Sequence, residues 1–177
     1  MMLATAAAAA LVATRYTDHG WSRAMWLLAG LAVQGRLLCN LLDGMVAAER
    51  GSASRLGEIF NEVPDRYSDA AILVGLGYAA GGLPALGWAA ALAAVLTAYV
   101  RAVGKGLGLA SDYRGPMAKQ QRMVLVTLLS VIGLVVPTVE KDYRLAAWTA
   151  GIITAGAAVT AVRRLAGILG RLRREAL

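Results

Sequence analysis

The sequence predicts an all-α, polytopic integral membrane protein with about six transmembrane helices. Of its 177 residues, 58% are hydrophobic and only 16% are charged, whereas about 25% of residues in soluble proteins are charged. The mean hydropathy is +0.58, and apolar segments recur along the whole chain. Residues 84–100 and 123–139 carry no charged side chain at all. This pattern argues against a soluble helical bundle, in which each helix would present a polar face to water.

Six apolar segments are the expected helices. They cover approximately residues 2–14, 22–48, 56–82, 84–106, 119–138 and 144–162. Pro84 suits the first turn of the fourth helix, where its missing N–H is harmless, and Pro137 suits the end of the fifth. The first segment has only about a dozen residues before Arg15, although a span needs about 20. We therefore expect a short or truncated first helix, because a signal peptide would begin with basic residues.

The chain is expected to form a single membrane domain over residues 1–177, since no linker or internal repeat interrupts the apolar segments. Its basic C-terminal tail, RRLAGILGRLRREAL at residues 163–177, alternates basic and apolar side chains. This alternation predicts an amphipathic helix lying on the membrane surface. The single cysteine, Cys39, excludes an internal disulfide and a cysteine-based zinc site.

The net charge of +7 is distributed as expected for a protein beside anionic lipid, and no motif or basic stripe indicates a nucleic-acid partner. One side of the predicted bundle carries twelve basic residues: Arg50, Arg55, Arg101, Lys105, Arg114, Lys119, Arg122, Arg163, Arg164, Arg171, Arg173 and Arg174. The opposite side carries four: Arg15, Arg23, Lys141 and Arg144. The positive-inside rule therefore predicts a multi-pass protein of the inner (cytoplasmic) membrane with both termini in the cytoplasm.

Polar side chains form a stripe on each of two neighbouring predicted helices. Asn40 and Asp43 are three residues apart on the second helix. On the third, Asn61, Asp65 and Asp69 follow at intervals of four, so each set shares one helix face. The loop between the helices is short, which makes them antiparallel neighbours and lets the stripes converge. Oxygen ligands without His or Cys favour a hard cation such as Mg²⁺, Mn²⁺ or Ca²⁺, and ionisable groups in membrane segments are candidate functional groups.

The stretch NLLDGMVAAERGSASRLGEIFNEVPD at residues 40–65 resembles the motif of the CDP-alcohol phosphotransferase family, D-x2-D-G-x2-A-R-x8-G-x3-D-x3-D. The spacing is the same throughout. The positions that match in type are Asp43, Gly44, Ala47, Gly57 and Asp65. Asn40 and Asn61 stand where aspartate is usual, and Ala48 stands where arginine is usual. The resemblance extends over most of residues 22–170, and residues 99–123 are similar to the family's fourth helix, the following loop and the start of the fifth helix.

The resemblance implies a membrane transferase of phospholipid biosynthesis. Such an enzyme binds CDP-diacylglycerol or another CDP-alcohol, and a small alcohol acceptor attacks the phosphorus so that CMP leaves. It implies divalent metal ions, Mg²⁺ or Mn²⁺, held by Asn40, Asp43, Asn61 and Asp65. Asp65 would also be the catalytic base, and the residues around the nucleotide would be Gly44, Ala47 and Gly57. Membrane lipids are further expected partners, and a homodimer is an expected assembly.

The two asparagines remove two negative charges from a site that concentrates cations. The binding of two metal ions should therefore weaken, towards a single tight site, although amide oxygens can still act as ligands. Glu62 and Asp69 lie near enough on the same helix to restore part of the charge; alternatively, they form structural ion pairs with Arg66 or Arg36. Arg50 or Arg55 could replace the arginine missing at position 48. The intact remainder of the motif indicates a distinct, active branch, and a catalytically degenerate relative that binds lipid or nucleotide is the alternative.

Basic residues between the fourth and fifth helices have two interpretations. Arg101, Lys119 and Arg122, with Lys105, could form a pocket for the phosphate of an acceptor such as glycerol phosphate or inositol phosphate. Alternatively, they anchor the helices by reaching to the lipid headgroups. A transporter or scaffold is the competing class of function. It is disfavoured because the polar residues gather at one membrane face and form no path across the membrane.

Overall fold

The chain folds into a bundle of helices, as the sequence predicts. The computed structural model describes residues 1–49, 55–138 and 141–175, and these contain helices but no strand. The helices are α1 (Met2–Ala13), α2 (His19–Glu49), α3 (Arg55–Tyr78), the 3-10 helix η1 (Ala79–Gly81), α4 (Pro84–Gly106), α5 (Lys119–Val135) and α6 (Tyr143–Glu175). Each expected apolar segment corresponds to one α-helix, so the all-helical class is confirmed.

Three stretches of the described chain are long and apolar enough to cross a membrane. They are His19–Val46, Pro84–Gly106 and Tyr143–Arg174. Large apolar side chains also face outward along the bundle, and Leu31, Leu92 and Val162 are each more than 60% exposed. A surface of this kind is expected where lipid rather than water surrounds the helices. The membrane class therefore follows from the described helices, while the number of spans stays a prediction.

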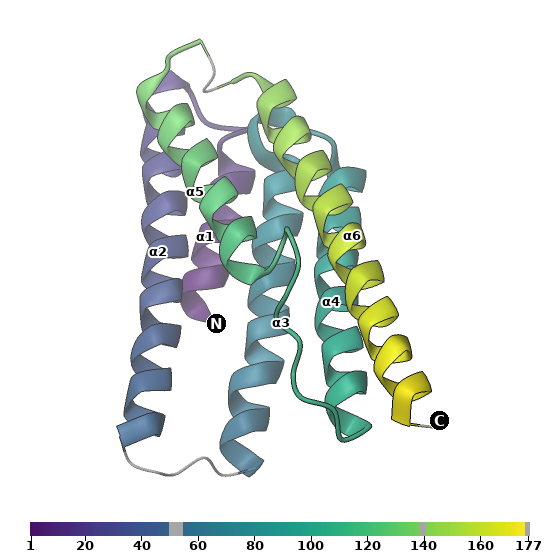
Figure 1. Cartoon of the computed structure of the whole chain (residues 1–177). Helices are drawn as coiled ribbons and strands as arrows, with labels where there is room; N and C mark the ends of the chain where they lie inside the picture. Colours follow the sequence, from purple (N-terminus) through teal and green to yellow (C-terminus); the bar gives the residue numbers. More distant parts are fainter. Residues whose placement is uncertain (50–54, 139–140, 176–177) are drawn as a thin grey trace.

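The helices pack in pairs that bring distant parts of the sequence together. Helix α1 contacts α2 and α3, α2 contacts α5, α3 contacts α4, and α4 contacts α6. Figure 1 shows that α3 begins at the same end of the bundle at which α4 and α6 end. We call this the site end. Segment 107–118 then runs back along the bundle from α4 to the start of α5, which lies near mid-height.

Small residues allow close approach of the helices. A Cβ on Gly75 would lie 2.8 Å from the Cα of Ala8, and a Cβ on Gly77 would lie 2.7 Å from the Cα of Gly87. Small residues at helix contacts are typical of membrane bundles, where packing replaces the hydrophobic effect as a driving force. These contacts fix α3 against α1 on one side and against α4 on the other.

The C-terminal tail differs from its prediction. Residues 163–175 continue α6 without a break, where the sequence pattern predicted a separate helix lying on the membrane surface. No proline interrupts this stretch, and Arg164 and Ile168 remain buried against the bundle. Tertiary packing therefore keeps the tail in line with α6.

Candidate active site

The polar stripes of α2 and α3 face one cavity, which we call the acidic cavity. Its volume is about 330 Å³, and its lining includes Arg36, Asn40, Asp43, Asn61 and Asp65. The structure thus brings together the four metal ligands that the family resemblance implies. The convergence follows from the antiparallel packing of two helices whose polar residues recur every three or four positions.

The structure describes only some of the residues that the family resemblance implies around the nucleotide. Gly44 follows Asp43 on α2, and a Cβ built on it meets no atom within 4 Å. Gly57 lies half-buried in the first turns of α3. The side chains of Ala47, Ala48 and Arg55 and the whole of Arg50 fall outside the described residues, so their predicted roles stay predictions.

Asp65 is held by donors from α2 and α5. Its Oδ1 accepts hydrogen bonds from Nη2 of Arg36 and, at 3.0 Å, from Nδ2 of Asn40. Its Oδ2 accepts a hydrogen bond of 2.6 Å from Nζ of Lys119. Arg36 is itself buried and donates from Nε to the Ser68 hydroxyl at 3.3 Å. The carboxylate is therefore fixed in position with a positive charge beside each oxygen.

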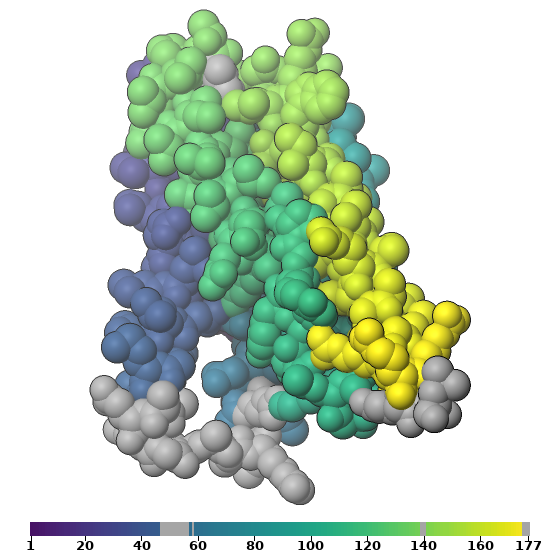
Figure 2. All heavy atoms as spheres, viewed as in Figure 1, coloured from purple at the N-terminus to yellow at the C-terminus, as the bar shows by residue number. Residues whose placement is uncertain are grey.

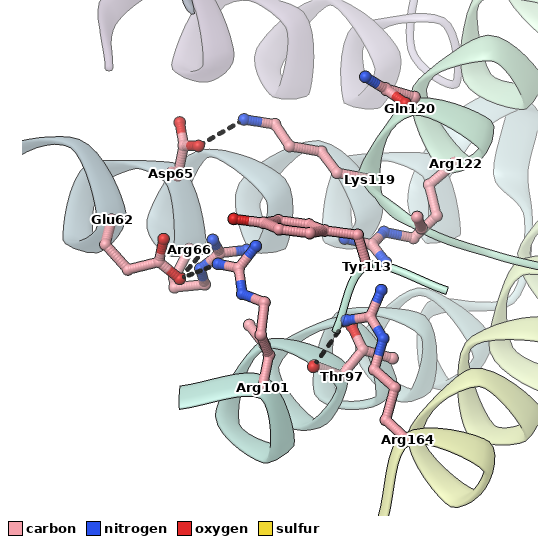
Figure 3. A pocket seen from close by; sticks show the side chains of 12 residues that line it. Glu62, Asp65, Arg66, Thr97, Arg101, Tyr113, Lys119, Gln120, Arg122 and Arg164 are labelled. Atoms are coloured by element: carbon pink, nitrogen blue, oxygen red, sulfur yellow. Dashed lines mark hydrogen bonds and ion pairs between the residues drawn. The ribbon is translucent and has the colours of Figure 1, made fainter. Parts of the chain in front are cut away.

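A second cavity, the basic cavity, lies on the other side of Asp65 between α3, α4, α5 and α6. Its volume is about 260 Å³. The charged side chains that line it are Glu62, Asp65, Arg66, Arg101, Lys119, Arg122 and Arg164. Figure 3 shows these side chains converging around the ring of Tyr113, which lies between Lys119 and Arg101. Five cationic groups thus face two carboxylates.

Glu62 and Asp69, carboxylates of α3 that the structure describes, do not supply charge to the acidic cavity. Glu62 accepts hydrogen bonds of 2.6 Å from both Arg66 and Arg101. Asp69 is buried and accepts one of 2.9 Å from Arg122. The idea that these residues restore the lost charge is therefore wrong for the arrangement seen. Of the predicted structural pairs, Glu62 with Arg66 is present, but the partner of Asp69 comes from α5.

Arg122 and Arg66 retain unused hydrogen-bonding capacity. Arg122 is almost fully buried, and its Nη1 donates to the Met117 carbonyl at 3.1 Å. The Nε atoms of Arg66 and Arg122 are buried without an acceptor among the described residues. Buried donors normally have partners, so these two Nε atoms are exceptions in the part of the chain that the structure describes.

Segment 107–118 forms one wall of the basic cavity and is anchored on α6. Arg164 donates from Nε to the Arg114 carbonyl at 3.0 Å and from Nη1 to the Thr97 carbonyl at 3.1 Å. The Met117 N–H donates to the Thr160 hydroxyl at 3.0 Å. Figure 2 shows side chains of this segment covering the bundle between α5 and the lower part of α6. This anchoring positions Tyr113, whose ring centroid lies 5.1 Å from the guanidinium carbon of Arg101.

Asp112 stabilises segment 107–118 through hydrogen bonds with Arg114 of the same segment. It accepts three hydrogen bonds from Arg114: from the N–H at 2.9 Å, from Nε at 3.1 Å and from Nη2 at 2.9 Å. These bonds to Arg114 lower the pKa of Asp112 to about 2. The carboxylate is therefore ionised over the whole physiological range, and its Oδ2 also lies 3.7 Å from Nη2 of Arg171 on α6.

Sequence reasoning missed two residues of the site. Helical spacing indicates Arg36 only as a partner for Glu62 or Asp69, and the sequence shows Arg164 only as one of the basic residues of the tail. Arg36 precedes Asn40 by one helical turn, so its place on the polar face of α2 could have been inferred. Nothing in the spacing of Arg164 pointed to α4 or to segment 107–118.

The donor chemistry of the acidic cavity suits a hard divalent cation. Its oxygen donors are the carboxylates of Asp43 and Asp65 and the amides of Asn40 and Asn61. Carboxylate and amide oxygens are the ligands that Mg²⁺ and Mn²⁺ prefer. The part of the chain that the structure describes holds no group of three or more His, Cys, Asp or Glu side chains around a possible metal position, so the negative charge is limited.

Comparison with known proteins relates the chain to enzymes of phospholipid synthesis. It is 32% identical over 169 residues to archaetidylinositol phosphate synthase of Aeropyrum pernix, which covers 96% of this chain and 80% of that protein. It is 28% identical over 156 residues to phosphatidylinositol phosphate synthase of Mycobacteroides abscessus, which covers 81% of this chain and 68% of that protein. No family model matches the chain.

The fold is similar to that of the Mycobacterium tuberculosis phosphatidylinositol phosphate synthase. The crystal structure of that enzyme with manganese and citrate superposes with a TM-score of 0.72 at 21% identity, covering 95% of this chain and 79% of that one. Its structure with CDP-DAG bound gives a TM-score of 0.68 at 20% identity, covering 94% and 84%. At these identities the likeness concerns the fold, and it agrees with the helix order described above.

Proposed function

The chain belongs to the CDP-alcohol phosphotransferase family, and from that premise we propose that it transfers a phosphatidyl group from CDP-diacylglycerol to a phosphorylated alcohol. It is a membrane transferase of phospholipid biosynthesis, and CMP is its second product. The acceptor that we propose is a small alcohol bearing a phosphate, with inositol phosphate as the first candidate.

One observation carries this proposal: Asp65 lines both cavities. A base in this position has the donor on one side, in the acidic cavity, and the acceptor on the other, in the basic cavity. A general base must lie within hydrogen-bonding reach of the proton that it removes. A carboxylate shared by the two cavities satisfies this requirement for an acceptor bound among the cations of α3, α4 and α5.

The charge of the basic cavity supports a phosphorylated acceptor. Arginine and lysine are the usual ligands of phosphate, and arginine binds it through two parallel hydrogen bonds. The excess of cations over carboxylates in the lining of the basic cavity suits a dianion better than serine or choline. Choline carries a positive charge, which five surrounding cations would repel.

The reaction that we propose is a direct displacement at phosphorus. Asp65 accepts the proton of the acceptor hydroxyl while the oxygen forms a bond to the phosphorus of the phosphatidyl group. The bond from phosphorus to the CMP oxygen breaks, and CMP leaves with the electron pair. Arg101, Lys119 and Arg122 orient the acceptor through its phosphate. Asp43, Asp65, Asn40 and Asn61 would hold a divalent cation, Mg²⁺ or Mn²⁺, which would neutralise charge on the diphosphate.

The finer topology belongs to the same proposal. Six spans, with the site end and both termini on the cytoplasmic side of the inner membrane, are supported by the concentration of Arg and Lys at that end. The Asn40 and Asn61 motif then marks a branch of the family. A homodimer stays an expectation from the family resemblance.

A catalytically degenerate relative is the second candidate function. The observation that favours it is the ion pairing of both Asp65 oxygens, which occupies the base in the absence of substrate. Such a protein would bind CDP-diacylglycerol and would release no CMP.

The experiment that separates these candidates measures CMP release by purified protein in detergent. The assay contains CDP-diacylglycerol, Mg²⁺ or Mn²⁺, and inositol phosphate, glycerol phosphate, inositol, serine or choline. We expect metal-dependent release that Asp65→Asn lowers by about a hundredfold or more, since a general base contributes about that factor. Asp18→Asn, a matched change at the opposite end of the bundle, should keep wild-type activity. Binding of CDP-diacylglycerol without CMP release from any acceptor would favour the degenerate relative.

A further inference from the structure

We propose that Arg36 and Lys119 provide, from the protein itself, the positive charge that a second metal ion would bring, so that the site binds a single divalent cation. This inference rests on the proposed function and concerns the same cavity. It assigns a role to Arg36, a residue outside the family motif, and gives a physical reason for asparagine at position 40.

Both oxygens of Asp65 accept hydrogen bonds from cationic side chains. Arg36 and Lys119 contact different oxygens of the carboxylate, so both oxygens already have a cationic neighbour. Arg36 is about 9% exposed, and its Nε is bonded to Ser68, which fixes its orientation. A buried guanidinium with two hydrogen-bond acceptors is a permanent part of the site, unlike an exposed ion pair whose partners are readily replaced by water.

Asn40 fits this arrangement better than aspartate would. Its amide donates a hydrogen bond of 3.0 Å to Oδ1 of Asp65. An ionised aspartate can only accept hydrogen bonds, so a carboxylate at position 40 would repel Asp65 unless a cation lay between them. Asparagine completes a set of donors around Asp65 and removes the need for a cation at that point.

The charges around the acidic cavity allow one divalent ion. Among the described residues, Asp43 and Asp65 are the carboxylates that line it, and Arg36 and Lys119 both contact Asp65, so the negative charge of Asp65 is already offset. Glu62 and Asp69 are paired elsewhere. Asp43 is exposed and carries the negative charge that no cation of the described chain balances. A single cation centred on Asp43 is therefore expected.

Arg36 and Lys119 also line different cavities beside Asp65. Arg36 lines the acidic cavity, where the diphosphate of the donor would lie, and Lys119 lines the basic cavity, where the acceptor phosphate would lie. Each is thus placed to attract one of the two anionic substrates toward the same carboxylate. Preorganised charge of this kind stabilises developing negative charge without further rearrangement.

The test is the number of Mn²⁺ ions bound per chain, measured by titration calorimetry and by electron paramagnetic resonance on purified protein in detergent. We expect one Mn²⁺ in the wild type and two in Asn40→Asp/Asn61→Asp, which restores four carboxylates. Gln121→Glu, which adds a carboxylate on an exposed face of α5, should still bind one. Two Mn²⁺ in the wild type, none in the wild type, or one in the double variant would each overturn the inference.

Arg36→Gln tests the charge of Arg36 separately from its packing. It also provides a test of the inference if the double variant fails to fold. Loss of the guanidinium charge should raise the affinity for Mn²⁺ by about tenfold, since the cation then meets less repulsion. Arg36→Lys should keep the wild-type affinity. An unchanged affinity in Arg36→Gln would contradict the inference, because a purely structural role would leave the affinity unchanged or lower it.

Parallel measurement of CMP release keeps this inference distinct from the proposed function. Two bound Mn²⁺ ions with CMP release would refute the single-ion site and leave the transferase standing. One bound Mn²⁺ without CMP release from any acceptor would support the single-ion site and refute the transferase.

Discussion

At the level of single residues, the two oxygens of Asp65 are held by different parts of the fold. Oδ1 is bonded from α2 and Oδ2 from the start of α5. The convergence of Asn40 and Asp43 with Asn61 and Asp65 was predictable from helical spacing together with the short loop between the two helices. Spacing puts each pair on one helix face, and the loop makes the helices antiparallel neighbours. The contact with Lys119 depends on how α5 packs, and no local pattern in the sequence encodes that.

Arg101 provides a prediction at this scale. Arg101→Gln should raise the KM for the phosphorylated acceptor by about tenfold to a hundredfold, since a hydrogen bond to a charged group contributes about 1.5–3 kcal/mol. The KM for CDP-diacylglycerol should change little, because Arg101 lines only the basic cavity of the two. Steady-state kinetics of CMP release check this, with Arg144→Gln at the opposite end as the control. Equal effects on both KM values would contradict the placement of the acceptor.

At the level of elements, segment 107–118 determines the shape of the basic cavity. Its backbone is fixed by Gly115, which has φ of +141°, and a Cβ there would lie 2.3 Å from Cγ2 of Thr160. The helix positions were predictable from hydropathy and proline placement, but the path of this segment was not. It depends on contacts with Thr160 and Arg164, more than 40 residues away in the sequence.

Gly115→Ala should therefore displace the segment. We expect a loss of stability of about 1–3 kcal/mol, the usual cost of a residue forced into an unfavourable backbone region, and a clear loss of CMP release. Gly151→Ala in α6 is the matched control, because a Cβ there meets no atom within 4 Å and alanine favours helix. Thermal unfolding in detergent measures both changes. A Gly115→Ala protein as stable and active as the wild type would show that the anchoring is unimportant.

The pH dependence of the same segment follows from Asp112. Its pKa is lowered to about 2 in the folded chain, so its ionised form is favoured by folding. The stabilisation is fully present above the ordinary pKa of aspartate, near 3.8, and is lost as the pH falls towards 2. Limited proteolysis with an acid-active protease should leave the segment intact at pH 5 and cleave it below about pH 3. Asp112→Asn should be cleaved to a similar extent at both pH values.

At the level of the whole molecule, the asymmetry of charge sets the expected orientation. Prediction of the overall class succeeded because apolar composition and periodicity act along the entire chain. Prediction of the tail failed because Arg164 and Ile168 pack against the bundle, a contact that alternation of basic and apolar residues does not reveal. The same contact makes Arg164 part of the basic cavity.

Orientation can be tested by cysteine labelling in a Cys39→Ser background. A cysteine introduced at Arg15 should react with a membrane-impermeant maleimide in bacterial cells whose outer membrane has been made permeable. A cysteine at Arg114 should react only after the inner membrane is also opened, since the positive-inside rule predicts that the site end lies in the cytoplasm. Labelling of the Arg114 position before that step would reverse the proposed topology.

The measurement that tests the central claim most directly compares inositol phosphate with inositol as acceptors in CMP release from CDP-diacylglycerol. The basic cavity predicts that kcat/KM for the phosphorylated acceptor exceeds that for inositol by about a hundredfold or more, equivalent to one or two charge-assisted hydrogen bonds. The phosphatidyl product should carry the acceptor's phosphate. Equal kcat/KM values for the two acceptors, or a preference for inositol, would contradict the account of a phosphate bound beside Asp65.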